Sequence, residues 1–211
     1  MAQYLVIHPQ NPQARLIRAA VSIVEKGGVI AYPTDSSYAL GCALENKEGR
    51  DRICRLRALD ARYPFTLVCR DLSDIATYAQ VDNRIYRVLR AHTPGPYTFV
   101  LPATREVPRR LLDPKRRTIG LRIPNNAVAQ ALLAELRAPL MSVTLVLPGE
   151  EDPLGDPLAI RERLEHMIDA VIDGGDCVGE PTTVVEWDGQ NFHVHRAGTG
   201  DVSVFAPDVG G

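Results

Sequence analysis

The sequence predicts an α/β fold in which helices cover both faces of a mixed β-sheet, giving a three-layer arrangement. Amphipathic helical segments alternate with short apolar runs from residue 12 to residue 172, and the C-terminal part favours paired strands. The chain has 211 residues, of which 45% are hydrophobic, so it can bury a sizeable core. No repeat, low-complexity tract or Gly/Ser linker interrupts it, and we expect residues 1–211 to form a single domain.

The individual elements follow from capping residues and hydrophobic periodicity. A first helix is expected to begin at Asn11-Pro12 and to end at Gly27-Gly28. The polar turn 33–37 should follow a buried strand directly. The predicted strands cover residues 29–32, 65–69, 97–101, 118–123, 140–147 and 170–172, with a hairpin of residues 182–187 and 192–196. The later helices are predicted over residues 47–57, 83–91 and 158–168, with a short one from Asp71 or Ser73 and one from Asn125 or Asn126 to Leu136.

Charge is segregated along the chain although its formal net charge is only −2. Residues 50–122 hold 16 Lys/Arg and 7 Asp/Glu, a local charge of +9, whereas residues 135–190 hold 3 and 13, a local charge of −10. This asymmetry favours a basic face that meets an anionic partner. Of the 24 cations 21 are arginine, whose planar guanidinium suits phosphate or carboxylate, although a GC-rich genome would give the same bias.

Several kinds of site are not predicted. The four cysteines are widely spaced without a CxxC pair, and no stretch of 18 apolar residues could span a membrane. No signal peptide is visible, so the expected location is the cytoplasm. The sequence also contains no GxxxxGK[ST] loop, no GxGxxG loop and no GxSxG elbow. His193 and His195 share one face of a predicted strand, but no third metal ligand is nearby, and we predict no metal site.

Two polar segments are more informative. The run 33–38, Pro-Thr-Asp-Ser-Ser-Tyr, follows a buried strand at the end where ligands collect in open α/β sheets. Turn geometry alone would also explain its Asp and Ser residues. In the predicted strand 118–123, Thr118, Gly120 and Arg122 share one face, which suits an anion unless that face is a solvent-exposed edge.

Together these segments resemble the YrdC-like family, most closely its YciO branch, over roughly residues 12–200. The resemblance depends on the number and order of its sequence blocks rather than on any one of them. The matching blocks here are residues 33–41, 94–98 (Pro-Gly-Pro-Tyr-Thr), 118–124 (Thr-Ile-Gly-Leu-Arg-Ile-Pro), 182–184 (Thr-Thr-Val) and 196–198 (Arg-Ala-Gly).

The resemblance implies a three-layer YrdC-like fold with a twisted mixed sheet and a concave basic face that also suits RNA. Catalytic members of the family are threonylcarbamoyl-AMP synthases, which combine L-threonine, bicarbonate and ATP, release pyrophosphate, and supply the t6A modification of tRNA. Mg²⁺ is expected to accompany ATP, and no tightly bound cofactor is implied. Such chemistry needs cations and hydroxyl donors fixed around the phosphates.

The resemblance also assigns roles to individual residues. The positions that match threonine-binding residues are Thr34, Arg122, Ser142 and Thr182. The positions that match ATP-binding residues are Arg57, Thr118, Thr144 and Arg196, and of these Arg57 and Thr144 would act as catalytic residues. Arg122 would hold the carboxylate of threonine with two hydrogen bonds.

Two blocks depart from the family pattern. The K-x-R block reads Arg57-Ala58-Leu59, and the S-x-N block reads Thr144-Leu145-Val146, so one arginine and one asparagine are lost. Arg62 is a candidate replacement for the lost cation. Losing a single oxyanion-type donor costs about 10²–10³ in rate, so we expect weak activity. Two alternatives remain: an RNA-binding maturation factor for double-stranded RNA, tRNA or rRNA, and an interaction protein whose arginines form only surface ion pairs.

Overall fold

The computed structural model describes residues 1–60, 63–113, 115–177 and 179–205. These residues contain a sheet of ten strands. The strands are β1 (Gln3–Val6), β2 (Ile30–Pro33), β3 (Tyr38–Ala43), β4 (Thr66–Val68), β5 (Tyr97–Pro102), β6 (Thr118–Arg122), β7 (Leu140–Thr144), β8 (Ala170–Asp173), β9 (Thr183–Trp187) and β10 (Phe192–Arg196).

Helices connect many of these strands, and most begin at a side-chain cap. They are α1 (Ala14–Glu25), α2 (Lys47–Leu56), α3 (Leu72–Tyr78), α4 (Asn83–His92), α5 (Ala127–Leu136) and α6 (Pro157–Leu164), with 3₁₀ turns η1 (Arg109–Leu111) and η2 (Ser203–Phe205). Asp71, Asp82 and Asn126 each accept backbone N–H bonds in the first turn of α3, α4 and α5, as their positions predict.

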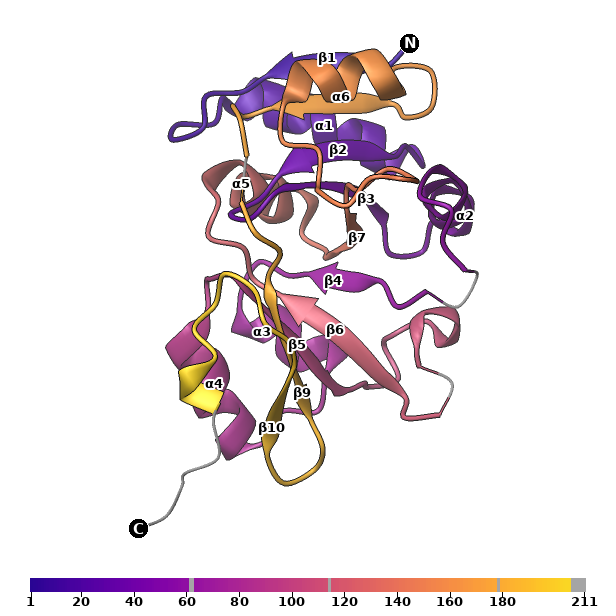
Figure 1. The fold of residues 1–211 in the computed structure, drawn as a ribbon. Coiled ribbons are helices and arrows are strands. Elements are labelled where there is room, and N and C mark those ends of the chain that lie inside the picture. The colour runs from indigo at the N-terminus through magenta and orange to yellow at the C-terminus, as the bar shows by residue number, and fades with distance from the viewer. Residues whose placement is uncertain (61–62, 114, 178, 206–211) are drawn as a thin grey trace.

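The sheet is mixed, as expected. Its strand order is β1-β8-β2-β3-β7-β4-β6-β5-β9-β10, and it descends in Figure 1 from the N-terminal strand to the β9–β10 hairpin. The pairs β1–β8, β2–β8, β4–β6 and β5–β9 are parallel, and the other five neighbouring pairs are antiparallel.

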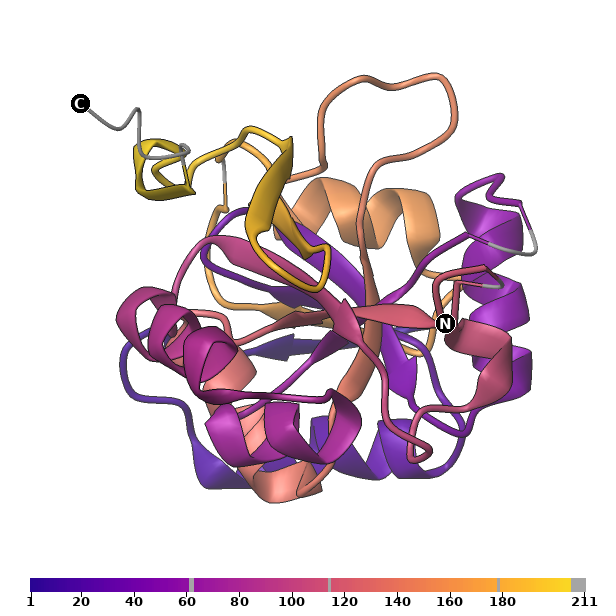
Figure 2. The same ribbon diagram turned by 90° about the horizontal axis from the view of Figure 1, so that it is seen from below.

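Helices lie on both sides of the sheet, so the three-layer prediction is confirmed. Figure 2 shows α6 on one side of the strands and α1 with α5 on the other. The buried faces of α1 and α5 pack on β2, β8 and part of β3, and this forms one of the two hydrophobic clusters. The larger cluster takes its helical side chains from α2, α3, α4 and α6.

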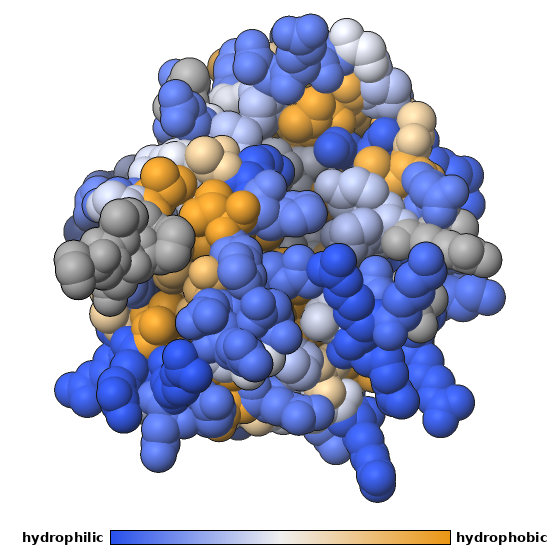
Figure 3. Space-filling model, turned by 60° about the horizontal axis from the view of Figure 1, so that its bottom comes forward, coloured by the Kyte–Doolittle hydropathy of each residue, from blue (hydrophilic) through white to orange (hydrophobic). Residues whose placement is uncertain are grey.

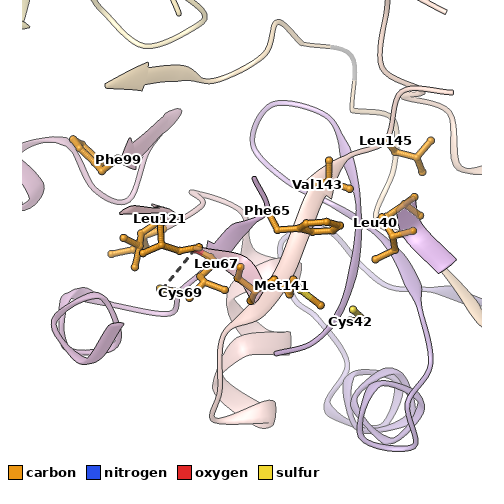
Figure 4. Close-up of a cluster of buried hydrophobic side chains, with 14 of the residues drawn as sticks. Leu40, Cys42, Phe65, Leu67, Cys69, Phe99, Leu121, Met141, Val143 and Leu145 are labelled. Atoms are coloured by element: carbon orange, nitrogen blue, oxygen red, sulfur yellow. Dashed lines mark hydrogen bonds between the residues drawn. The ribbon is translucent and has the colours of Figure 1, made fainter. Parts of the chain in front are cut away.

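A continuous row of apolar side chains forms the centre of the larger cluster. The register aligns Cys42, Met141, Leu67, Leu121 and Phe99 across neighbouring strands, and all are fully buried. Figure 4 shows these side chains together, with the Cys69 thiol bonded to the Leu67 carbonyl. Because side chains alternate along each strand, the neighbouring residues of these strands face the opposite side of the sheet.

Several sequence-based boundaries were wrong. Strands β1 and β3 were not predicted. The turn 33–37 follows the buried strand β2, as expected, and joins it to the antiparallel strand β3. Five of the six residues of β3 are buried, so it lacks the alternation that reveals a half-exposed strand. Helix α1 begins after Gln13 rather than at Asn11, β7 ends at Thr144, and α6 ends at Leu164.

Candidate functional site

A cavity of about 390 Å³ lies on the face of the sheet opposite the apolar row. Its floor is a second row of residues in register across five strands. From β7 to β9 this row is Ser142, Thr66, Gly120, Val100 and Glu186, and all five line the cavity. The cavity therefore begins on the same face of the sheet as α1 and α5, beyond the strands that these helices cover.

Gly120 keeps the floor of the cavity open. A Cβ atom at this position would lie 3.1 Å from the Thr66 hydroxyl oxygen and 3.4 Å from the Thr98 methyl carbon. The Thr98 hydroxyl is itself hydrogen-bonded to that of Thr182, at 3.0 Å. A side chain at position 120 would therefore occupy the space between hydroxyl groups that a ligand can use.

The deeper end of the cavity is built around Arg122. Its side chain is only 9% exposed, and it forms an ion pair with Asp35 and donates to the Ser36 hydroxyl at 3.1 Å. The Arg122 Nε and the second Asp35 carboxylate oxygen are buried without a hydrogen-bond partner in the described structure. Buried polar atoms are normally satisfied, so this end of the cavity retains unused hydrogen-bonding capacity.

Neutral hydroxyl groups surround this arginine. The Tyr32 and Ser142 hydroxyls are 2.8 Å apart, and Ser142 also donates to the Leu40 carbonyl at 3.0 Å. Burial raises the pKa of Tyr32 to about 12, so its phenol stays protonated at neutral pH. The Thr34 hydroxyl donates to the Ser37 carbonyl and fixes the turn between β2 and β3. Arg122 is paired with Asp35, but it is surrounded by hydroxyls and its Nε has no partner in the described structure, so it suits a small carboxylate ligand.

The shallower end of the cavity carries two further arginines. Arg116 forms a 2.5 Å ion pair with Glu186, and its side chain is 66% exposed. Arg196 donates from Nη2 to the Thr182 carbonyl at 2.9 Å and more weakly from Nε at 3.3 Å. The Thr182 hydroxyl thus links Arg196 to Thr98 of β5 through hydrogen bonds.

The structure brings together most of the residues that the family resemblance singled out. Seven of the eight line this one cavity, namely Thr34, Thr118, Arg122, Ser142, Thr144, Thr182 and Arg196. Their separate roles toward threonine and ATP stay predictions. The prediction that β6 faces an anion site is favoured over a solvent-exposed edge, because β6 is an interior strand between β4 and β5.

Arg57 is the predicted residue that does not line the cavity. It is the C-cap residue of α2, and its Nη1 donates to the Val146 carbonyl at 2.9 Å. Burial lowers the pKa of its guanidinium, and the nearby Tyr63, which does line the cavity, opposes that shift. Arg57 therefore lies next to the lining residue Tyr63 without being part of the lining, and it contacts the other altered block through Val146.

The two departures from the family pattern also lie outside the cavity lining. Leu59 is partly buried and packs against the larger hydrophobic cluster. Val146 follows β7 and offers its carbonyl to Arg57, so the two altered blocks meet in space. Arg62, the candidate replacement cation, lies outside the described residues.

Sequence reasoning missed several lining residues. Thr66 and Thr98 face the cavity because they alternate with buried apolar residues of β4 and β5, a signal that the sequence contains. Tyr63, Asp113, Arg116, Glu186 and His195 also line the cavity. Arg116 and Glu186 are 70 residues apart, and no local pattern indicates that they pair.

Other features of the described residues carry less chemistry. No group of three or more His, Cys, Asp or Glu side chains among them could hold a metal ion. None of their helices is both long enough and apolar enough to cross a membrane. A second hollow of about 530 Å³ lies between α2 and α6, and its Arg52 and Arg163 are engaged by Asp169 and Glu150.

The fold and the site show an α/β protein with a mixed sheet and a small-ligand cavity on its open face. A buried arginine and a set of hydroxyls line this cavity. Within this class of α/β protein the chain belongs to the Sua5/YciO/YrdC family, whose model, described as "Telomere recombination", matches residues 22–198. The family resemblance read from the motif blocks is thereby confirmed.

Individual relatives agree with this assignment. The chain is 53% identical over 205 residues to the uncharacterized protein YciO of Escherichia coli, a match that covers 97% of this chain and all of that one. The crystal structure of E. coli YciO superposes with a TM-score of 0.93 over the same shares. A threonylcarbamoyl-AMP synthase of Halorhodospira halophila is 30% identical over 79% of this chain and 86% of its own.

A more distant structure shares the fold. P. abyssi Sua5 complexed with L-threonine superposes with a TM-score of 0.84 at 22% identity, over 92% of this chain and 57% of that one.

Proposed function

We propose that the cavity binds L-threonine at its buried end and ATP or an adenylate at its exposed end, and that the chain forms or processes threonylcarbamoyl-AMP. The observation that carries this proposal is the convergence of seven predicted ligand residues on one cavity. The kinship with threonylcarbamoyl-AMP synthases supports the choice of reaction. The product would supply the t6A modification of tRNA.

The geometry suits two ligands of different character. Arg122 is buried among hydroxyls, where a carboxylate would gain strong, directional hydrogen bonds in a low-dielectric setting. Arg196 lies at the exposed end, where charged phosphates remain partly solvated. Thr118 and Thr144 line the same cavity as the two arginines, so a carbamate formed on threonine would meet the α-phosphate within it.

Magnesium fits this scheme as a companion of ATP. No described cluster of carboxylates could hold it, and Glu186, the acidic residue of the floor, is engaged by Arg116. The metal would arrive on the phosphates and neutralise the departing pyrophosphate. Bicarbonate would be the third substrate.

Activity is expected to be weak, because the altered blocks withdraw one cation and one amide from the family pattern. The test is pyrophosphate release from ATP with L-threonine and bicarbonate. We expect a slow rate that depends on threonine, and a large gain in the variant Leu59→Arg/Val146→Asn. Leu56→Arg, a change of the same kind at the end of α2, is the matched control and should give no gain.

Calorimetry with each ligand separates binding from turnover. L-Threonine binding should be lost in Arg122→Met and weakened in Ser142→Ala. If neither L-threonine nor ATP binds at millimolar concentration, the proposed function is wrong.

A second candidate function is RNA binding. Figure 3 shows strongly hydrophilic side chains gathered on the lower face of the molecule. Exposed cations that form no ion pair among the described residues include Arg87, Arg90, Arg105, Arg109 and Lys115. RNA held by these cations should dissociate steeply as salt rises. A salt-independent affinity, or no retention of RNA at low salt, would exclude this function.

A further inference from the structure

We propose that Arg116 and Arg196 form a polyphosphate-binding subsite at the exposed end of the cavity. Without ligand, the Glu186 carboxylate forms an ion pair with Arg116, and a bound phosphate replaces this carboxylate as the partner of Arg116. This inference rests on the proposed function, in which ATP is a substrate. It adds two residues, Arg116 and Glu186, that the family blocks do not include.

The two arginines come from separate parts of the chain and line the same cavity. Arg116 precedes β6, and Arg196 ends β10. Arg196 is held by the carbonyl and hydroxyl of Thr182, with no carboxylate partner among the described residues. Its guanidinium is therefore oriented by neutral groups and keeps its full charge for a ligand.

Hydrogen bonds hold the backbone of residues 115–117, on both sides of Arg116. The Asp113 carboxylate accepts the backbone N–H groups of Lys115 at 2.9 Å and of Arg116 at 2.6 Å, and these bonds lower the pKa of Asp113. The Arg117 N–H donates to the Asp113 carbonyl at 2.9 Å, and the Arg117 carbonyl accepts from Ala103 at 3.0 Å. Only the Arg116 side chain needs to move when it changes partner.

Glu186 has the position of a substitute anion. Its carboxylate lies at the end of the floor row and is 18% exposed, while the arginine that it binds is 66% exposed. This hydrogen bond raises the pKa of Arg116, so its guanidinium stays protonated. A polyphosphate offers more charge and more acceptor oxygens than one carboxylate, so it can displace Glu186.

The exchange would select for highly charged ligands. A monoanion binds Arg116 little better than the Glu186 carboxylate does. Its binding would also leave that carboxylate without its cation, which is unfavourable. Glu186 thus acts as a competing group that disfavours weak anions, a common source of specificity. The subsite would also supply a phosphate cation that the altered K-x-R block lacks, since Leu59 packs against the larger hydrophobic cluster and Arg57 lies outside the lining.

The test is calorimetric titration with tripolyphosphate, which carries the charge of the ATP tail without adenosine. The matched variants are Arg116→Gln and Arg117→Gln, because Arg117 is an exposed neighbour that does not line the cavity. We expect Arg116→Gln to weaken binding about tenfold, the loss typical of one charge-assisted hydrogen-bond pair near solvent, and Arg117→Gln to change it less than about twofold.

Glu186→Gln removes the competing charge and is expected to tighten tripolyphosphate binding about threefold or more. It should also reduce the preference for tripolyphosphate over acetate. Thermal unfolding of all three variants checks that the fold is retained.

Two outcomes would overturn the inference: equal losses in Arg116→Gln and Arg117→Gln, or no tripolyphosphate binding by the unaltered chain at millimolar concentration. Failure of the proposed function has a different signature, since L-threonine binding and threonine-dependent pyrophosphate release would be absent while tripolyphosphate still bound through Arg116.

Discussion

The buried pair of Arg122 and Asp35 should be strongly coupled in stability. Their side chains are 9% and 11% exposed, so each ion depends on the other for most of its compensation. Arg122 has one further partner, the Ser36 hydroxyl, while its Nε and one Asp35 oxygen have none in the described structure. Removing one partner of a buried ion pair typically destabilises a protein by about 3–5 kcal/mol, whereas replacing both by apolar groups often costs little.

The perturbations are Asp35→Leu, Arg122→Met and the double variant. We expect about 3 kcal/mol of lost stability for each single change, the low end of that range, because the cavity beside Arg122 admits water. The double variant should lose no more than either single one, about 3 kcal/mol instead of about 6, which gives a coupling energy of about 3 kcal/mol.

Urea unfolding measures these losses. The fluorescence of Trp187 reports the transition, because Trp187 is the single tryptophan of the chain and is only 9% exposed in the folded state. Arg87→Met, an exposed arginine on α4, is the control and should change stability by less than about 0.5 kcal/mol. Single losses below about 1 kcal/mol, or losses that add in the double variant, would refute the reasoning.

Three further predictions test other parts of the fold. Thr183→Val should cost about 2–4 kcal/mol in urea unfolding, because the buried hydroxyl donates to the Gly200 carbonyl and accepts from the Gly198 N–H; a loss under 1 kcal/mol would contradict this. Gly120→Val should lower L-threonine affinity at least about tenfold by filling the cavity floor, with the fold retained by circular dichroism, and unchanged affinity would count against the floor assignment. Burial raises the pKa of the Cys177 thiol, so its alkylation by iodoacetamide at pH 8 should be slower than that of glutathione and should accelerate up to pH 10. Equal rates at pH 8, read by mass spectrometry, would contradict that prediction.

Local signals in the sequence were sufficient for much of the fold. Asp71 and Asp82 cap α3 and α4, as the sequence indicated, because an aspartate directly before a run with helical hydrophobic periodicity is a typical N-cap. The N-terminal strand β1 was not predicted, because it is short and pairs with β8, whose residues lie more than 160 positions away. Burial on both faces likewise hid β3, since a strand without alternation gives no periodic signal.

The cavity shows the same division between local and distant information. The face shared by Thr118, Gly120 and Arg122 follows from alternation along one strand, and the structure places all three in the lining. The pairing of Arg116 with Glu186 depends on how β6, β5 and β9 stack across the sheet, which no spacing in the sequence specifies. Arg57 was assigned to ATP binding and catalysis from its position in the motif alone. The motif does not specify whether its side chain points into the cavity.

The alternation of cavity and core along the same strands has an evolutionary consequence. In β4, β6 and β7 the floor residues Thr66, Gly120 and Ser142 alternate with residues of the apolar row, namely Leu67, Leu121 and Met141. Ligand preference can therefore diverge by point substitution at positions such as Thr66 and Ser142 while the apolar row of the sheet keeps its composition. A one-residue insertion in any of these strands would instead exchange the two sets of side chains. Divergence of this cavity should accordingly proceed by substitution and leave strand lengths unchanged.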